Sequence, residues 1–311
     1  LDTLAIAQAA KANGGIVIAQ AKHIAAGGAI DPRLVNVPGN LVDVVVHHPD
    51  QWQTYETEYD PGPSGEERTA AEPPPPPRDV AKKILAGRAA MEVAAGNIVA
   101  VGFGASSEAV GVLAAGGMLD DITIGVEQGL VGGIPVRGRL FGMSRNPMAV
   151  IPMPSMFDTI SGAGLDICIL GLAQFDRHGA VNVSHIGGLL VGPGGFIDIS
   201  QAARRAVFCG TFTARGLRVT TKDGELVIEN EGSVPKIVSD VDAITFSGQQ
   251  ALADGRSALV VTERAVFELT DAGVRLMEIA PGISIERDIL PHMGFEPIID
   301  TPALMPAHLF E

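Results

Sequence analysis

Aromatic residues, cysteines and long apolar runs are all scarce in this chain. Aromatics make up 5% of the 311 residues, which argues against an aromatic-rich β-sandwich. No apolar run reaches the ~18 residues that a membrane span needs. The two cysteines, Cys168 and Cys209, lie inside apolar runs, so we expect buried free thiols and a reducing compartment, the cytoplasm. With 38 glycines and 46% hydrophobic residues, the composition favours an α/β protein.

Basic residues are too few to balance the acids, and the formal net charge is −14. This charge argues against nucleic acid and anionic membranes as partners. It leaves room for an anionic ligand, because glycine loops and helix N-termini bind phosphate through backbone N–H groups.

A proline-rich segment divides the chain into three stretches. Residues 1–50 contain a helix over 1–13 and apolar strands at 16–20 and 41–46. Residues 51–78, with five prolines in succession, are typical of an extended linker. Residues 79–311 begin a new unit of alternating strands and helices. Its expected elements are helices at 80–93, 108–115 and 284–292, strands at 97–101, 122–126, 149–151, 167–170, 180–184, 206–210, 258–261, 266–269 and 275–279, and a hairpin over 217–231.

A weak internal repeat connects the first stretch with the last. Val17–Gln20 precedes Pro38-Gly39 by the same spacing as Val260–Glu263 precedes Pro281-Gly282. The repeat predicts that residues 1–50 are the end of a unit similar to residues 79–311. The beginning of that first unit is expected to have been cut off.

A lone acid and a glycine-rich turn follow one of the expected strands. Glu127 comes directly after the apolar run 122–126, and Gly129, Gly132 and Gly133 come next. A strand fixes the backbone of such an acid, and glycines behind it let a substrate approach closely. The alternative interpretation is a solvated acid at a strand end. A second glycine turn, at 102–107, can offer N–H groups to a ligand or serve packing alone.

Other candidate sites are weaker. His178 and His185 lie near Asp176, but no third ligand has a spacing suited to a metal. The serines lack a Gly-x-Ser-x-Gly elbow, which argues against a serine hydrolase. Arg204-Arg205 is expected to be a solvated pair.

Taken in order along the chain, several motifs resemble those of the family I CoA-transferases. The nearest likeness is to the single-chain acetate/propionate and short-chain acyl-CoA:3-ketoacid enzymes, in which two similar α/β halves are fused. The resemblance places residues 79–311 in the second half and residues 1–50 at the end of the first. It implies a three-layer α/β/α fold with a mixed, mainly parallel sheet, related to that of sugar-phosphate isomerases. The motifs are Val126-Glu127, Gly129, Gly132-Gly133, Gly164-Leu165-Asp166, Gly194-Gly195-Phe196-Ile197-Asp198, Thr245–Gly248, Thr262–Phe267 and Glu278–Gly282.

The resemblance also implies a chemistry and a set of residues. Glu127 would be the nucleophile that forms a glutamyl–CoA thioester in a ping-pong reaction, with Gly194 or Gly195 as oxyanion donor. Coenzyme A or acyl-CoA would be a substrate, with no permanently bound cofactor and no metal. The acceptor would be a short-chain carboxylic acid. The missing first half, or a separate chain equivalent to it, would complete the active site. The assembled enzyme would be a homo-oligomer. The residues expected to bind CoA are Gly102, Phe103, Gly104, Ala105, Ser106 and Gly192.

The sequence departs from the family pattern at three places. Gly125 stands where relatives usually have threonine, Ala163 stands where they have glycine, and the turn at 102–104 lacks the proline common after it. Two alternatives remain open. One is an acyl-CoA hydrolase that uses the same glutamate, and the other is a non-catalytic binding domain with the isomerase-like fold.

Overall fold

A ten-stranded mixed sheet forms the body of the computed structural model, which describes residues 2–311 without the side chain of Ala163. Its strand order is β22-β21-β20-β19-β14-β9-β3-β4-β5-β8. The five central strands run parallel to one another. These strands are β4 (Thr123–Val126), β3 (Ile98–Val101), β9 (Leu165–Gly171), β14 (Ala203–Cys209) and β19 (Ser257–Val261).

Antiparallel strands extend this parallel centre on both sides. β20 (Ala265–Thr270) and β21 (Gly273–Ile279) continue it beyond β19, and β22 (Ala303–Leu304) pairs in parallel with β21. On the other side, β5 (Leu130–Val131) and β8 (Ala149–Val150) are antiparallel. The expected mixed, mainly parallel sheet is confirmed.

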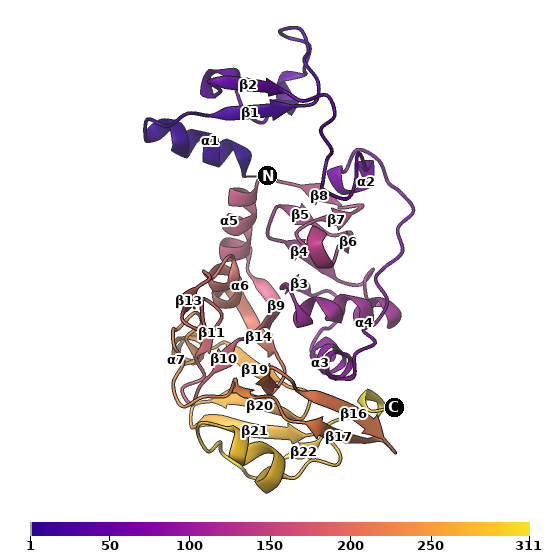
Figure 1. Ribbon diagram of the computed structural model, residues 1–311, viewed down its shortest axis with the longest axis vertical. Coiled ribbons are helices and arrows are strands. Elements are labelled where there is room, and N and C mark those ends of the chain that lie inside the picture. The colour runs from indigo at the N-terminus through magenta and orange to yellow at the C-terminus, as the bar shows by residue number, and fades with distance from the viewer. Residues whose placement is uncertain (1) are drawn as a thin grey trace.

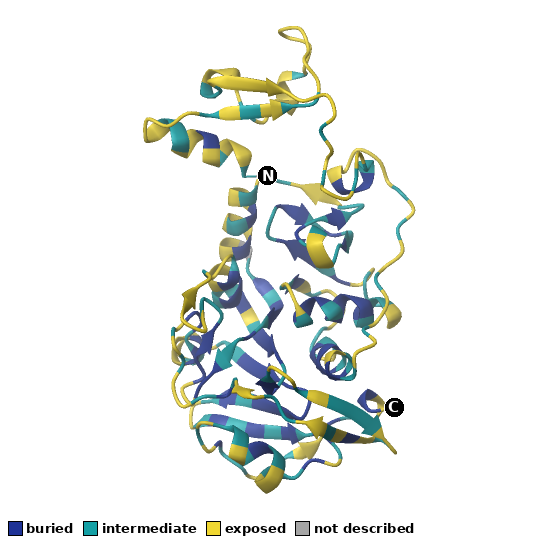
Figure 2. Ribbon diagram, viewed as in Figure 1, coloured by how far each residue is buried: buried dark blue, intermediate teal, exposed yellow. Residues whose placement is uncertain are grey.

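Helices cover both faces of the sheet (Figure 1). α3 (Val80–Ala90) and α4 (Ala109–Ala115) pack together on one face, and α5 (Met153–Ala163), α6 (Phe196–Ala202) and α7 (Gly248–Ala253) lie on the other. The central strands are therefore buried on both sides, as Figure 2 shows, which explains their nearly continuous apolar sequences. Cys168 and Cys209 are buried free thiols within these strands, as predicted. None of the helices formed by residues 2–311 has the length and apolar character required to span a bilayer.

The strand order reverses at β3, because the chain passes from β3 to β4 on one side and later returns to β9 on the other. β3 is the first of the parallel strands in the chain, but it lies between β4, which follows it, and β9, which comes third. Such a reversal of strand order is a topological switch point, where open α/β sheets bind ligands beyond the carboxyl ends of the strands. The fold therefore singles out the carboxyl ends of β3, β4 and β9.

The expected hairpin is formed by β16 (Arg218–Lys222) and β17 (Glu225–Asn230). Asp223 and Gly224 both have positive φ, 54° and 78°, as a two-residue type I′ turn requires. The expected last helix is instead a π turn, η5 (Ile285–Ile289), followed by the 3-10 turn η6 (Leu290–His292). The other short elements are β6 (Ile134–Pro135), β7 (Ser144–Arg145), β10 (Gln174–Phe175), β11 (Val181–Asn182), β12 (His185–Ile186), β13 (Leu189–Leu190), β15 (Thr213–Ala214), β18 (Val234–Pro235), η1 (Pro32–Leu34), η2 (Gly39–Leu41), η3 (Ala105–Glu108), η4 (Gly138–Leu140) and η7 (Ala307–Leu309).

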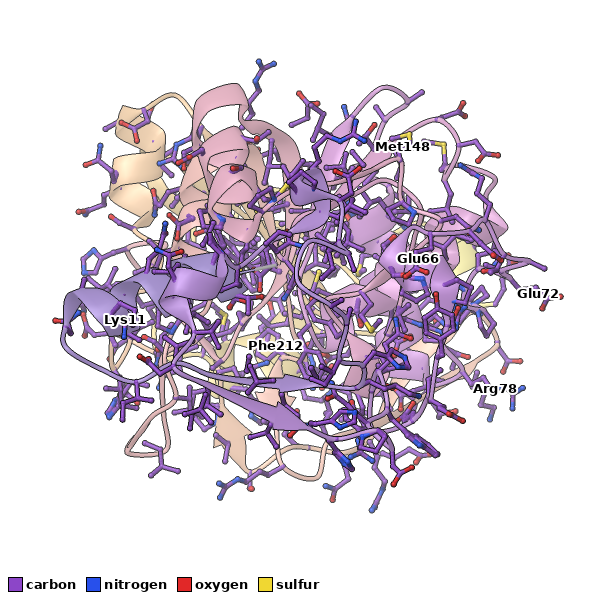
Figure 3. The ribbon with its side chains drawn as sticks, turned by 90° about the horizontal axis from the view of Figure 1, so that it is seen from above. Lys11, Glu66, Glu72, Arg78, Met148 and Phe212 are labelled. Carbon is purple, nitrogen blue, oxygen red and sulfur yellow. The ribbon has the colours of Figure 1, made fainter. Side chains whose placement is uncertain are left out.

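The linker is extended but attached to the body at several points. It contains a single helical turn, α2 (Pro61–Ser64), and its Thr69 exchanges two backbone hydrogen bonds of 2.9 Å with the side chain of Asn146. Further along, the carbonyl of Pro75 accepts a 3.0 Å hydrogen bond from Arg137. Figure 3 shows Glu72 and Arg78 of the linker at the outer edge of the molecule, on the opposite side from Lys11.

Residues 2–50 form a small unit that stands apart from the sheet (Figure 1). It consists of α1 (Thr3–Ala12) and the parallel pair β1 (Ile18–Ala21) and β2 (Val44–His47). Ala7 is its single buried residue, so this unit has no core of its own (Figure 2). Its exposed apolar side chains are Leu4, Ile6, Ile16, Ile18, Ile24, Ile30, Leu34, Val35, Val44, Val45 and Val46.

The two copies of the expected internal repeat differ in strand pairing. Val260 and Val261 belong to β19, whose neighbour β20 is antiparallel, whereas β1 pairs with a parallel strand.

Candidate active site

A cavity of about 380 Å³ opens at the switch point of the sheet. Its walls include the residues that follow β3, β4 and β9, namely Gly102, Glu127 and Gly171. The loop 192–195, which leads into α6, closes it from the other side. Three motifs that lie far apart in the sequence therefore meet at one place.

Glu127 sits at the tip of a tight hairpin between β4 and β5. Val126 pairs with Leu130, which leaves a loop of residues 127–129, closed by a 2.8 Å hydrogen bond from Gly129 N to Val126 O. Gly129 has a φ of +109°, a conformation that side chains other than glycine rarely adopt. The buried strand thus holds the acid rigidly at the cavity wall, and the predicted placement of Glu127 at a strand end is confirmed.

Gly195 packs directly against the carboxylate of Glu127. A Cβ atom at Gly195 would collide with Glu127 Oε2, and it would lie 3.0 Å from Cδ of the same side chain. The ring of Phe157, from α5, lies 3.1 Å from the same point. The absence of a side chain at position 195 therefore leaves room for the carboxylate.

Backbone donors are available beside this carboxylate. The N–H groups of Gly194 and Gly195 make no hydrogen bond with any atom of residues 2–311. Gly192 and Gly194 have φ of 82° and 56°, so glycine is needed for the path of this loop. Unpaired N–H groups at a cavity wall can bind an oxyanion without prior reorganisation.

The surroundings of Glu127 are mostly apolar. Burial raises the pKa of its carboxyl group, and the negative charge of Asp198 acts in the same direction. One hydrogen bond opposes them, from Gln128 Nε2 to Glu127 Oε1 at 3.4 Å. The Oε1 atom of Gln128 is itself buried without a partner in the described part of the chain. Within residues 2–311, Glu127 has no ion pair, so its carboxylate remains poorly stabilised.

The glycine turn after β3 contributes only in part. Gly102 and Phe103 line the cavity, but Gly104, Ala105 and Ser106 do not. The N–H of Gly102 is already bound to Ile169 O at 2.8 Å, and a Cβ there would lie 2.9 Å from Leu170 Cδ2, so this glycine serves packing. The hydroxyl of Ser106 donates back to Gly102 O at 2.9 Å and stabilises the turn.

Comparisons with known proteins identify relatives of the whole chain. No family model matches the chain. It is 42% identical over 306 residues to the caffeate CoA-transferase of Acetobacterium woodii, an alignment that covers 96% of this chain and 58% of that protein. The acyl-CoA transferase YdiF of Escherichia coli O157:H7, solved as a thioester complex with CoA, superposes with a TM-score of 0.89 at 39% identity over 100% of this chain and 58% of that one.

The chain belongs to the family I CoA-transferases.

A shorter relative is also informative about the organisation of this family member. The acetate CoA-transferase subunit beta of Escherichia coli K12 is 29% identical over 215 residues, which cover 66% of this chain and 88% of that subunit. The chain thus spans a little under three fifths of the longer relatives, while about two thirds of it aligns with most of this subunit.

Two glycines of the CoA-transferase-like motif have a different role from the one expected. Gly132 and Gly133 do not line the cavity. A Cβ at Gly132 would lie 2.6 Å from Met148 Cε, and one at Gly133 would collide with the backbone of residues 145 and 146. They serve the close packing of neighbouring chain segments, not the approach of a substrate.

The departure at Gly125 has a local explanation. A Cβ at this position would lie 2.6 Å from Cε of Met156, a residue of α5 that fills the space. A threonine would therefore require the end of the Met156 side chain to move in this member of the family. Ala163, the second departure, lies at the end of α5, and its side chain is outside the described structure.

Several cavity residues were not predicted from the sequence. Gln128 follows Glu127 directly, and that adjacency was the one available signal. Phe141 packs edge to face on Phe103 with 5.4 Å between ring centroids, and Arg137 forms an ion pair with Glu108. The segment that carries Arg137 and Phe141 has no motif, so sequence patterns could not identify it.

The weaker candidates lie away from the cavity. Asp176 is buried and its carboxylate accepts hydrogen bonds from the N–H groups of His178 and Ala180, which stabilises a turn. Arg204 is exposed, and Arg205 pairs with Glu92 at 2.6 Å.

Proposed function

We propose that this chain carries the nucleophile-bearing half of an enzyme that transfers CoA from a short-chain acyl-CoA to a carboxylic acid. The observation that supports this most strongly is the carboxylate of Glu127, fixed at the wall of a cavity and in contact with Gly195. Acetate, propionate and 3-oxoacids are the proposed acid substrates, and CoA is a substrate and not a permanently bound cofactor.

The reaction divides into two exchanges through a covalent intermediate. An oxygen of Glu127 attacks the thioester carbonyl, the C–S bond breaks, and CoA leaves as a thiolate from a mixed anhydride. The thiolate then attacks the glutamyl carbonyl, which releases the acyl group as a carboxylate and leaves a glutamyl–CoA thioester. A second carboxylate reverses both steps and leaves as the new acyl-CoA. No net proton transfer is required.

The environment of Glu127 fits this chemistry. A carboxylate is a weak nucleophile, and one whose pKa is raised by burial is destabilised in its charged form and therefore more reactive. Each attack produces a negative oxygen, which the unpaired N–H groups of Gly194 and Gly195 can stabilise. Binding of the remote parts of CoA would supply the orientation that a weak nucleophile needs.

We infer that residues 79–311 form the second half of the enzyme and residues 1–50 the end of the first half, joined by the linker 51–78. The ten-stranded sheet lies entirely within residues 98–304, whereas residues 2–50 expose their apolar side chains. Three further apolar side chains are exposed directly before the loop 192–195, those of Leu189, Leu190 and Val191. A first half, in the same polypeptide or as a separate chain, would cover these surfaces and complete the site of a homo-oligomer.

Intact mass measurement tests the nucleophile. The chain is incubated with propionyl-CoA, alone and together with a first half, as wild type, as Glu127→Ala and as Glu296→Ala, a control at an exposed acid. We expect a CoA-sized adduct on wild type and on the control that hydroxylamine removes, and none on Glu127→Ala.

The pattern of adducts also tests the assignment of the halves. An adduct that needs the first half supports a shared site, and an adduct on the chain alone contradicts that requirement. Release of free CoA without an acceptor acid would indicate a hydrolase. The absence of any adduct in both preparations would refute the proposed nucleophile.

A further inference from the structure

One wall of the candidate active-site cavity lies outside the ten-stranded sheet. It comes from the wall hairpin, residues 134–146, in which β6 and β7 pair with each other as a separate two-stranded sheet. The hairpin supplies six lining residues of the cavity, namely Pro135, Val136, Arg137, Phe141, Gly142 and Met143. The hydrogen-bonded ladder of the central sheet therefore does not by itself fix this wall.

The wall hairpin contacts Gln128, the neighbour of the proposed nucleophile. A Cβ atom at Gly142 would lie 2.9 Å from both Cδ and Nε2 of the Gln128 side chain. That Nε2 atom donates the 3.4 Å hydrogen bond to Glu127 Oε1. A displacement of the hairpin would therefore change the contact between Gln128 and Glu127.

The first part of the linker 51–78 runs along the wall hairpin. Asp60 forms a 2.6 Å ion pair with Arg145 of β7, and the turn α2, which follows Asp60, lies beside β7 (Figure 1). The hydroxyl of Tyr55 donates a hydrogen bond to Arg139 O. The guanidinium of Arg139 lies over the ring of Tyr55, 4.4 Å from its centroid. Both the ends and the middle of the hairpin are thus bound to the linker.

The second part of the linker meets two positions that are suited to its backbone. Asn146 has a φ of +54°, which few residues other than glycine adopt, and its amide exchanges two 2.9 Å hydrogen bonds with the backbone of Thr69. Gly111 lies within α4, where glycine is less favourable than alanine, but a Cβ there would collide with the carbonyl group of Pro75. The same carbonyl accepts the 3.0 Å hydrogen bond from Arg137. The linker therefore has a seat between α4 and the wall hairpin.

We propose that the linker is a positioning element of the active site, which holds the wall hairpin in contact with Gln128. Thr69 and Pro75 do not line the cavity themselves and act through the hairpin. A linker that only joined two halves would need neither the glycine inside α4 nor the two hydrogen bonds of Asn146. The proposal rests on the proposed function in treating Glu127 as the nucleophile, whereas the attachment of the hairpin does not depend on the reaction.

Two substitutions release the linker without removing a residue that lines the cavity. Asn146→Gly keeps a residue that adopts positive φ and loses both hydrogen bonds to Thr69. Gly111→Ala places a Cβ against Pro75, while alanine itself favours the helical conformation of α4.

Each substitution has a matched control. Asp223→Gly introduces glycine at an exposed position with the same φ of 54°, in the turn between β16 and β17. Gly116→Ala introduces alanine at the exposed C-terminal end of α4, where a Cβ would lie 3.5 Å from its nearest neighbour, an ordinary contact.

Hydrogen–deuterium exchange of the whole chain, read by mass spectrometry, measures the hairpin directly. Residues 134–146 include the amide of Val136, which is bound to Met143 O at 2.9 Å. In Asn146→Gly we expect these residues to exchange about tenfold faster than in wild type, because two hydrogen bonds together stabilise by about the 1.4 kcal/mol that changes an equilibrium constant tenfold. Gly111→Ala should change exchange in the same direction, and both controls should match wild type. Residues 203–209 of the central strand β14 should exchange equally in all five proteins, which shows that the fold is intact.

The pH profile of adduct formation is a readout that a merely structural linker would not change. Displacement of the hairpin should weaken the hydrogen bond from Gln128, which lowers the pKa of Glu127. The acidic limb should therefore move to higher pH in Asn146→Gly and Gly111→Ala. The charge of Asp198 on α6, which raises the pKa of Glu127, is present in every variant. An unmoved limb in variants whose hairpin exchanges faster overturns the positioning role.

The outcomes also separate this proposal from the proposed reaction. Exchange requires no turnover, so a hairpin that exchanges faster in both variants supports its attachment by the linker even if no protein forms an adduct. Wild-type exchange of residues 134–146 in both variants overturns the proposal and leaves the assignment of Glu127 intact.

Discussion

Glu127 Oε2 occupies the space in which Gly195 would carry a Cβ atom. The two residues come from different parts of the chain, one from the hairpin after β4 and the other from the loop before α6. The φ of Gly195 is −80°, which any residue can adopt, so glycine matters here through the contact with the carboxylate, which a side chain would displace. This contact couples the position of the nucleophile to the loop that carries the proposed oxyanion donors.

Replacement of Gly195 by alanine should displace the carboxylate without unfolding the chain. We expect Gly195→Ala to slow formation of the CoA adduct by about 100-fold, because a shift of about 1 Å at a reacting group has an effect of that size. Gly162→Ala in α5 is the matched control, since a Cβ there meets no atom within 4 Å. A Gly195→Ala protein with the wild-type rate would contradict the proposed role of this contact.

The raised pKa of Glu127 predicts how stability changes with pH. A carboxyl group whose pKa is higher in the folded than in the unfolded state holds its proton more firmly when folded. The protein therefore loses stability as the pH rises from the unfolded value of about 4.5 through the folded one. Glu127→Gln should accordingly melt at a higher temperature than wild type at pH 7, and the difference should shrink toward pH 4. Equal melting temperatures at pH 7 would mean that burial does not strain this carboxylate.

The hydrogen bond from Gln128 should affect the pH dependence of the reaction. Because this bond lowers the pKa of Glu127, its loss in Gln128→Met should raise that pKa further. The acidic limb of the profile for adduct formation, which follows ionisation of Glu127, is then expected to move to higher pH. A fall in rate with an unmoved limb would indicate that Gln128 acts only through packing.

The sequence was most informative where a signal is local. Glu127 could be placed at a strand end because an apolar run stops there, and the turn at Asp223-Gly224 could be assigned because it needs two residues of positive φ. Contacts between distant segments could not be predicted from the sequence, since they depend on the order of strands in the sheet. The meeting of Glu127 with Gly195 and of Lys236 with Gly210 are examples. For the same reason, the sequence predicts substrate contacts at Gly132 and Gly133, whereas in the structure both glycines allow close packing of chain segments.

A buried ion cluster connects α3 with β21, a strand near one edge of the sheet. Arg88 of α3 binds both carboxylate oxygens of Glu278 on β21, at 2.8 and 2.9 Å, and also binds Glu92 at 2.6 Å. Arg88→Met should lower the free energy of unfolding by about 3–5 kcal/mol, because it leaves Glu278 buried without its cation. Urea unfolding measures this loss.

Two further variants show whether the loss comes from the unpaired charge. Arg204→Met removes an exposed arginine that lies 3.6 Å from Asp166, and we expect a change within about 0.5 kcal/mol. In the double variant Arg88→Met with Glu278→Met, the buried carboxylate is absent, so part of the stability should return. If the double variant is instead destabilised by the sum of the two single changes, the arginine contributes through packing of its stem and not through compensation of the charge on Glu278.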